Sequence, residues 1–429
     1  MKTFGAGGFT ATLARLVALA IFFTLTLAFC TSSVVAKAPG VVPKAAASSA
    51  PARTLLVRQL DSALAGARVP AFRRGAVVVD LSSDETLFSR NAQAGLAPAS
   101  NEKLAVAFAA LTLLGSQFEI ATEVLGKGEQ NGTKWVGDIV LKGYGDPHLS
   151  SADLKTLALR LRAQGIRSVS GDLLGDESYF DRRRTAPGWK SSFLINECAP
   201  LSALSVDRGR NTSASPPVIA ARAFAAALAS AGVSLEGGVR VGTATGDEST
   251  LATINSPPLW KLIRFMDQES DNYTAELLLK QLGADSNGRG TTANGAAEVM
   301  SALDSAGIPL ARVRIVDGSG LSLLDRLTPV ALTDLLTAVW SDPSLRRPFV
   351  YSLAVAGRNG TLAHRLRQRP ALGNVRAKTG TTNGASALSG YVRNRYAFVI
   401  LQNGSPVSST LTRAAQDRFV TLLAAQKNP

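Results

Sequence analysis

Apolar positions recur along the chain with two periods, and together they predict a fold with both helices and strands. Residues 54–64 place leucines at helical spacing, and residues 100–114 form a long apolar run that predicts a second helix. Short apolar runs bounded by polar or small residues are typical of strands. Such runs occur near both ends of the chain, at 75–80, 85–88, 385–392 and 396–401. We therefore predict a sheet to which both ends of the chain contribute strands.

The middle of the chain has a different pattern. From about residue 120 to 250 the sequence is richer in Gly, Ser and Asp, and its apolar runs are short. Here we predict strands at 135–141 and 169–174 and a helix at 154–164. Helical spacing returns at 258–265, 274–282, 293–306, 329–340 and 411–425. The pattern predicts an α/β (α+β) fold whose main domain, residues 54–120 and 250–429, is interrupted by inserted mainly-β or α+β modules over 121–249.

The first 36 residues read as a secretory signal peptide. Lys2 and Arg15 supply positive charge, an apolar run follows, and small residues end at Ala36. A retained membrane anchor is the alternative, but the apolar run is short for a span. Lipidation at Cys30 is a further alternative, which the bulky Phe29 before it disfavours. We expect an exported, periplasmic or extracytoplasmic protein, with residues 37–53 as a low-complexity linker.

Composition narrows the possible partners. The net charge is +14, which favours electrostatic association with anionic wall polymers or membrane headgroups, although charge for solubility alone explains it equally well. Nucleic acid is the weaker interpretation, because the longest basic run is only residues 182–184 and aromatic residues are few. Cleavage after Ala36 leaves Cys198 as the single cysteine, so no internal disulfide forms, and we predict a small buried residue there rather than a nucleophile.

Several kinds of active site are disfavoured. The chain has two histidines, His148 and His364, which we interpret as ordinary turn and helix residues, and it has no paired cysteine cluster. A zinc hydrolase is therefore not expected. The sequence also contains no Gly-x-Ser-x-Gly elbow and no phosphate-binding loop of the Walker type. A hydrolase of this sequence needs a nucleophile that is activated by something other than histidine.

Ser100 and Lys103 offer such a pair. A spacing of three places both side chains on one helical face, within reach of each other. Lysine acts as a base only when burial or a second cation destabilises its ammonium form. Ser-x-x-Lys is a weak signal alone, since a serine at a helix start is also a common N-cap.

Two further short motifs follow in the chain. Ser270-Asp271-Asn272 precedes a predicted helix, where it could also be a helix cap, and its active-site interpretation makes Ser270 a proton relay and Asn272 a binder of the substrate amide. Lys378-Thr379-Gly380-Thr381 precedes a predicted strand, and a simple turn is its alternative. On an edge strand, Lys378 would supply the second cation, the hydroxyls of Thr379 and Thr381 would bind a carboxylate, and Gly380 would let an extended peptide lie close.

The three motifs in this order form the set typical of penicillin-binding proteins and class A β-lactamases. The sequence resembles the class C low-molecular-mass penicillin-binding proteins, the D-alanyl-D-alanine carboxypeptidase/endopeptidase family. The resemblance covers most of the exported chain and is carried by longer blocks at 98–104, 145–147, 317–322, 326–329, 356–362, 377–381 and 386–391. The long interval between Ser100 and Ser270 favours this family over class A β-lactamases, and neither Glu276 nor Glu298 lies in the context of a deacylating glutamate.

The resemblance implies a β-lactamase/transpeptidase-like domain and a serine DD-peptidase that acts on peptidoglycan stem peptides and is inhibited covalently by β-lactams. It implies that Ser100 is the nucleophile, Lys103 the general base and Ser270 the proton shuttle. Asn272, Lys378, Thr379, Gly380 and Thr381 would bind substrate, backbone N–H groups of Ser100 and Thr381 would form the oxyanion hole, and no cofactor or metal is required.

Other blocks are less specific. Asp146 would contact the peptide stem, although Asp-Pro is also a common turn. Residues 317–320 are expected to form a structural turn rather than part of a site. Two other functions stay open: a β-lactamase-like or esterase hydrolase of the same fold, and a non-catalytic wall-binding protein, which the completeness of all three motifs disfavours.

Overall fold

The computed structural model describes residues 50–426. The predicted signal peptide, 1–36, and most of the predicted linker lie outside the described residues. Residues 50–53 of that linker are helical, because α1 spans Ala50–Ala65. Within the described part of the chain, no helix is long and apolar enough to cross a membrane.

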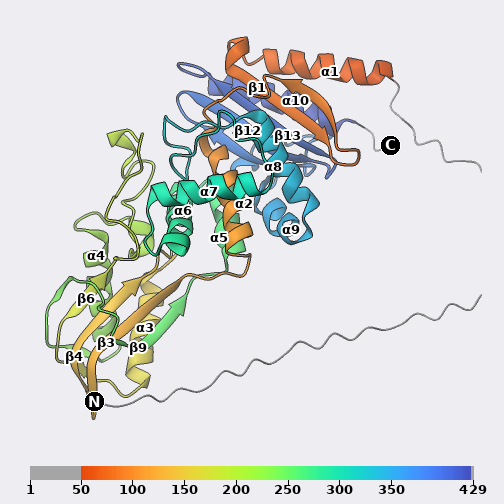
Figure 1. Cartoon of the computed structure of the whole chain (residues 1–429). Coiled ribbons are helices and arrows are strands. Elements are labelled where there is room, and N and C mark those ends of the chain that lie inside the picture. Colours follow the sequence, from red (N-terminus) through yellow and green to blue (C-terminus); the bar gives the residue numbers. More distant parts are fainter. Residues whose placement is uncertain (1–49, 427–429) are drawn as a thin grey trace, which may run out of the picture. The chain divides into compact units, whose positions relative to one another are not determined.

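A six-stranded sheet forms the centre of the main domain (Figure 1). Its strand order is β10-β11-β12-β13-β1-β2, and all neighbouring pairs are antiparallel. The strands are β1 (Arg74–Asp80), β2 (Glu85–Arg90), β10 (Ala354–Val355), β11 (Val375–Thr381), β12 (Ala385–Val392) and β13 (Tyr396–Asn403). Strands from both ends of the chain therefore share one sheet, which confirms that prediction.

Both faces of this sheet are covered, and the alternation of side chains along β13 shows how. Phe398 and Ile400 join a core cluster with α1 and α10 (Ser409–Ala424). Val399 and Leu401 point the other way and join a larger helical core. Because successive strand residues face opposite sides, a strand that is buried on both faces reads as a continuous apolar run.

The helical layer is organised around α2 (Glu102–Leu113), whose first ten residues, Glu102 to Leu111, are all buried. A helix that is buried all round lies at the centre of a domain. The helices of the same layer are α5 (Leu259–Gln268), α6 (Asn272–Asn287), α7 (Thr292–Ser305), α8 (Pro329–Ser341) and α9 (Pro343–Ser352). The helix α9, which contains Pro348, was not predicted from the sequence.

The inserted segment carries a second sheet with strand order β7-β5-β4-β3-β9, extended by β6 beside β4 and by β8 beside β6. Its central hairpin is β3 (Ala121–Asn131) and β4 (Lys134–Gly143), and two helices, α3 (Ser151–Ala163) and α4 (Pro216–Ser230), pack on its core cluster. The other strands are β5 (Ser168–Val169), β6 (Leu173–Asp176), β7 (Ser234–Leu235), β8 (Val239–Val241) and β9 (Ser249–Asn255). The sheet thus continues through β9, a few residues past the expected end of the insert.

One predicted strand, 169–174, is in fact two. β5 and β6 both run parallel to β4, and residues 170–172 between them make only irregular hydrogen bonds to β4. Here the Asp138 carboxylate accepts a hydrogen bond from the Asp172 backbone N–H at 2.7 Å. A side chain that replaces a ladder partner in this way ends regular pairing.

Residues 176–212 form a long irregular segment that packs against the main domain. Phe180, Cys198 and Leu201 share a core cluster with Tyr273 and Leu277 of α6. Cys198 is a buried free thiol whose pKa is raised well above its ordinary value by burial, as expected of a structural rather than a reactive cysteine. This segment forms one wall of the candidate site.

Candidate active site

Ser100 lies in a short 3-10 turn, η2 (Ala99–Asn101), that leads into α2. It does not cap the helix: the N-cap residue of α2 is Asn101, which makes no side-chain cap hydrogen bond. Ala99 has a φ of 48°, a conformation that costs energy for a non-glycine residue. The backbone of Gly320 lies so close to the Ala99 carbonyl that a Cβ there would clash. The nucleophile segment is therefore held by a tight approach between two distant parts of the chain.

Lys103 lies one helical turn after Ser100 and is fully buried. Its Nζ lies 3.1 Å from Ser100 Oγ, 2.8 Å from Asn272 Oδ1 and 2.7 Å from the Ser319 carbonyl oxygen. Burial lowers the pKa of Lys103, while nearby carboxylates, first that of Asp317, act in the opposite direction. The spacing of the Ser-x-x-Lys motif thus brings the two side chains into contact, as predicted.

Buried carboxyl groups lie near the Lys103 side chain. The Glu276 carboxylate accepts hydrogen bonds from the backbone N–H groups of Gly318 (3.0 Å) and Ser319 (2.8 Å). Asp317 accepts from the N–H groups of Gly320 and Ser322, both at 2.7 Å. These bonds shape the bend that directs the Ser319 carbonyl at Lys103. Residues 317–320 form the predicted turn, but the expectation that this turn is no part of the site is wrong, because the Ser319 carbonyl accepts a hydrogen bond from Lys103.

Two buried acids near Lys103, Glu276 and Glu102, have raised pKa values. Burial, followed by the charge of Asp317, raises the pKa of Glu276 to about 8. Burial, again followed by Asp317, raises the pKa of Glu102 well above its ordinary value. Carboxyl groups crowded in a dry environment hold their protons because they cannot all be ionised together.

Ser270 and Lys378 form the second half of the site. The Lys378 ammonium donates to Ser270 Oγ at 2.8 Å and to the Thr379 carbonyl at 3.0 Å. Ser270 has a φ of 57°, so the backbone is in the left-handed region at this serine. Burial and the positive charge of Lys103 lower the pKa of Lys378 to about 7, and the nearby Asp267 carboxylate opposes this shift.

The two halves are joined through Asn101 and Asn272. Asn101 Nδ2 donates to the Lys378 carbonyl at 3.1 Å, which ties the strand of the third motif to the turn that carries the first. Asn272 Oδ1 accepts from Lys103, and its Nδ2 donates to the Glu197 carbonyl at 2.9 Å. The inserted segment therefore orients the Asn272 amide.

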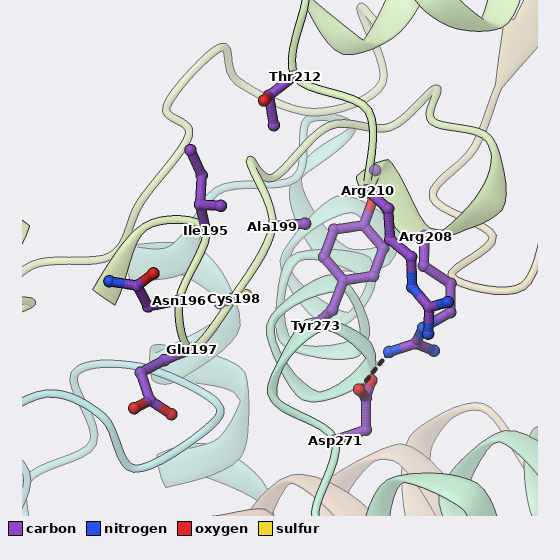
Figure 2. Close-up of a pocket in the computed structure, with 11 residues that line it drawn as sticks. Ile195, Asn196, Glu197, Cys198, Ala199, Arg208, Arg210, Thr212, Asp271 and Tyr273 are labelled. Carbon is purple, nitrogen blue, oxygen red and sulfur yellow. Dashed lines mark hydrogen bonds and ion pairs between the residues drawn. The ribbon is translucent and has the colours of Figure 1, made fainter. Parts of the chain in front are cut away.

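Asp271, between Ser270 and Asn272, does cap α6, because it accepts from the Thr274 backbone N–H at 2.7 Å. Its carboxylate also forms an ion pair with Arg208 of the inserted segment (Figure 2). The cap and the active-site interpretations of this motif are thus compatible.

The third motif lies on β11, beside an open edge. β10 pairs only with Arg376 and Ala377 of β11, so residues 378–381 have β12 on one side only. Thr379 Oγ1 lies 2.9 Å from Thr361 Oγ1, and the Arg413 guanidinium lies 3.4 Å from Thr381 Oγ1. A side chain at position 380 would crowd the Pro98 carbonyl, since a Cβ there would lie only 2.9 Å from it.

Asp146 stands apart from these groups. Its carboxylate accepts from the His148 backbone N–H at 2.8 Å and makes no hydrogen bond to Ser100, Lys103 or Ser270 in the described residues. Burial raises the pKa of Asp146 to about 7. His148 lies in a turn, as predicted, whereas His364 lies in a turn rather than a helix.

Sequence reasoning missed the groups that support the motifs: Glu276, the Ser319 and Glu197 carbonyls, and Arg208. Backbone carbonyls leave no signal in a sequence. Glu276 does offer one, since it follows Asn272 by four positions and so lies on the same face of α6. No cluster of three or more residues that could hold a metal ion occurs among residues 50–426.

Comparison with known proteins places the chain in a family. The profile of the D-Ala-D-Ala carboxypeptidase 3 (S13) family matches residues 56–217 and 210–426, which is most of the chain. The chain belongs to this family. The membership confirms the predicted resemblance and the predicted enzyme class, a serine-type D-Ala-D-Ala carboxypeptidase.

Individual relatives agree with this assignment. The D-alanyl-D-alanine carboxypeptidase of Actinomadura sp. (strain R39) is 31% identical over 90% of this chain and 87% of its own length. Carboxypeptidase DacB of Mycolicibacterium smegmatis is 32% identical over 87% of this chain and 85% of its own length. Penicillin-binding protein 4 of Haemophilus influenzae has the same fold, with a TM-score of 0.76 at 23% identity, over 85% of this chain and 98% of that one.

Proposed function

We propose that Ser100 is the nucleophile of this carboxypeptidase and that Lys103 is its general base. The observation that carries the proposal is the 3.1 Å contact between Lys103 Nζ and Ser100 Oγ at a fully buried lysine. The substrate is the D-alanyl-D-alanine end of a peptidoglycan stem peptide. The named activity of the Actinomadura and Mycolicibacterium relatives supports this choice.

The other two contacts of Lys103 orient its lone pair. The Asn272 Oδ1 and Ser319 carbonyl oxygens accept hydrogen bonds only. A neutral lysine has two N–H bonds, and these two oxygens accept both of them. The lone pair is then left for the hydroxyl hydrogen of Ser100. The Ser100 proton moves to Lys103 as Oγ attacks the carbonyl carbon between the two D-alanines.

The departing amine must gain a proton as the C–N bond breaks. Lys378 donates to Ser270 Oγ, so the hydroxyl hydrogen of Ser270 is free to face the leaving nitrogen. Ser270 gives this proton to the amine and takes one from Lys103, which restores the neutral base. The products are free D-alanine and an ester between Ser100 and the shortened stem.

The oxyanion of the tetrahedral intermediate is stabilised by the backbone N–H groups of Ser100 and Thr381. The Thr382 N–H bonds to β12 at Ala385, and N–H groups alternate in direction along a strand. The Thr381 N–H therefore points to the open edge. Each such donor contributes about 3 kcal/mol to the transition state.

Residues of β11 and α6 bind the substrate on either side of the scissile bond. The hydroxyls of Thr379 and Thr381 bind the terminal carboxylate, and the missing side chain at Gly380 lets β11 lie close to the Pro98–Ala99 turn before Ser100. Asn272 Nδ2, which has one hydrogen in the bond to Glu197, uses the other for the amide on the acyl side.

Water then hydrolyses the ester with Lys103 again as base, so the cycle needs no cofactor. β-Lactams inhibit by the same attack, because the opened ring stays attached and excludes water. The structurally similar penicillin-binding protein 4 of Haemophilus influenzae has been solved in complex with a β-lactam. The enzyme works outside the cytoplasm, where peptidoglycan lies, after cleavage of the signal at 1–36. The chain has a net charge of +14, of which the signal carries only Lys2 and Arg15, so the mature enzyme stays basic and favours anionic wall polymers and headgroups.

Labelling with fluorescent penicillin tests the nucleophile. The mature protein should form one covalent adduct, located on Ser100 by peptide mass spectrometry. Ser100→Ala should lose the adduct and D-alanine release, whereas Ser62→Ala, an exposed serine on α1, should keep both. An adduct on another residue, or equal labelling of Ser100→Ala with an unchanged melting temperature, contradicts the proposal.

A further inference from the structure

Trp189 donates a hydrogen bond to a buried carboxylate near Lys103. It lies in the irregular segment that forms one wall of the site. Its indole Nε1 lies 2.7 Å from Asp317 Oδ2. The Asp317 carboxylate also accepts from two backbone N–H groups and one hydroxyl within the next five residues of the chain. Trp189 therefore adds a donor from 128 positions away in the sequence.

The residues just before Trp189 contact the same part of the main domain. Ser322 Oγ donates to the Pro187 carbonyl at 2.8 Å. Gly188 has a φ of 81°, and a Cβ at this position would lie only 2.4 Å from Ser322 Oγ. Glycine adopts this left-handed backbone readily. Residues 187–189 can therefore lie directly against the chain that follows Asp317.

These contacts bear on the proposed base, because the turn that begins at Asp317 carries the Ser319 carbonyl. That oxygen accepts from Lys103 Nζ at 2.7 Å. The second oxygen on Lys103, Asn272 Oδ1, belongs to an amide whose Nδ2 donates to the Glu197 carbonyl, in the loop shown in Figure 2. The irregular segment thus contacts both groups that accept from Lys103, Asn272 directly and Ser319 through its turn.

We propose that the irregular segment is a positioning element for the general base, and that Trp189 is the positioning residue through which it acts on Lys103. The indole fixes the Asp317 carboxylate, Asp317 fixes the bend of its turn, and the turn directs the Ser319 carbonyl at Lys103. This inference rests on the proposed function, which makes Lys103 the base. It also gives the segment a part in acylation by every substrate, including those that do not touch it.

The indole bond also supports a negative charge near the base. Hydrogen bonds to a carboxylate stabilise its ionised form. Burial lowers the pKa of Lys103, and the charge of Asp317 is the first of those that oppose this shift. The other charged or titratable groups around Lys103 and Asp317 are Glu102 on α2, Cys198 of the irregular segment, Asp267 on α5, Asp271 and Glu276 at α6, Asp325 after the turn, and Lys378 on β11.

Trp189→Phe removes the donor and keeps an aromatic ring in the same place. Penicillin acylation should slow about ten-fold, because a hydrogen bond to an ionised carboxylate is among the stronger ones. The acidic side of the pH–acylation profile should also move to lower pH, since a less stabilised Asp317 charge supports the Lys103 ammonium less. Stopped-flow acylation with fluorescent penicillin across the pH range measures both effects. The rate constant does not depend on the folded fraction, which changes only the amplitude.

Trp135→Phe is the matched control. This tryptophan lies in the second sheet of the insert, and its indole also donates, to the Asp138 carbonyl at 3.2 Å. The variant should keep the wild-type rate and pH profile. If Trp189→Phe does not fold, Ser322→Ala removes the Pro187 contact from the main-domain side and should slow acylation about three-fold.

A double-mutant cycle tests the route through the carboxylate. Asp317→Asn should slow acylation by itself. Combined with Trp189→Phe, it should lose less than the product of the two single losses, because both variants change one hydrogen bond.

An unchanged rate constant in Trp189→Phe, or an equal loss in Trp135→Phe, would overturn the inference. A slower Trp189→Phe with an unmoved pH profile and a loss that simply multiplies with that of Asp317→Asn would also overturn it, since the indole would then act only by packing. Failure of the proposed function has a different signature, namely a penicillin adduct on a residue other than Ser100 or wild-type acylation in Lys103→Arg.

Discussion

The two buried lysines of the site have different surroundings, although both are completely removed from water. Lys103 contacts one hydroxyl and two oxygens that only accept, and buried carboxyl groups lie beneath it. Lys378 contacts the Ser270 hydroxyl and its own strand, with Asp267 as the nearby acid. The two accepting oxygens leave the lone pair of Lys103 to point at the Ser100 hydroxyl. Lys378 instead donates a hydrogen bond to the Ser270 hydroxyl.

The difference shows how one residue type supplies two kinds of chemistry. Burial lowers the pKa of both lysines, and each positive charge disfavours the other, so the pair favours a single proton. The geometry of the acceptors then assigns the base to Lys103 and the cation to Lys378. Replacements that keep the charge but remove basicity test this assignment most strongly.

Lys103→Arg should have the largest effect. Arginine stays protonated in proteins, so it cannot accept the Ser100 proton, and penicillin acylation should fall about 1,000-fold, within the range of general-base catalysis. Lys378→Arg keeps a cation and should lose only about ten-fold. Stopped-flow acylation with fluorescent penicillin measures both, and melting temperatures identify any misfolding in these buried positions. Equal losses in the two variants would abolish the distinction between base and cation.

The pH dependence of acylation should show the same division. At low pH Lys103 is protonated and cannot accept a proton, so the rate rises with pH. Because burial lowers the pKa of Lys378, its cation is lost on the alkaline side and the rate should fall again there. In Lys378→Arg this alkaline fall should be absent while the acidic side stays. An unchanged alkaline side in this variant would mean that Lys378 does not titrate there.

Glu276 should matter through its hydrogen bonds rather than its charge. Its pKa of about 8 keeps much of it protonated at neutral pH, so Glu276→Gln, which retains an acceptor for Gly318 and Ser319, should acylate within about three-fold of wild type. Glu276→Leu leaves both N–H groups unpaired and should lose about ten-fold or more. Glu298→Leu on α7 is the control. If glutamine failed to rescue, a positioning role for Glu276 through Ser319 would be excluded.

Asp146→Asn should have the smallest effect. Asparagine can still accept from the His148 N–H, and Asp146 makes no hydrogen bond to Ser100, Lys103 or Ser270. Penicillin acylation should stay within about two-fold of wild type. A change in D-alanine release from stem peptides, with normal penicillin acylation, would show that Asp146 contacts the stem. A large loss in both assays would instead place it in the catalytic machinery.

Local sequence patterns predicted much of the main domain. The strand 385–392 has the predicted bounds, and the predicted helices of the main domain are present. Elements without a clear period were missed, among them β3, which carries four exposed polar residues at its end, and α4, an alanine-rich helix that begins at Pro216. Strand pairing within the second sheet stabilises β3, and packing on the core of that sheet stabilises α4.

For the site, the Ser100–Lys103 pair follows from helical spacing alone, because a separation of three puts two side chains on one face wherever a helix forms. The contact between Lys103 and the Ser319 carbonyl spans 216 positions, and it exists because α6, the 317–320 turn and α2 pack together. The positions of the backbone carbonyls, the ion pair between Arg208 and Asp271 and the burial of both lysines arise from such long-range packing. No local periodicity encodes these features, since the residues that create them become neighbours only when the chain is folded.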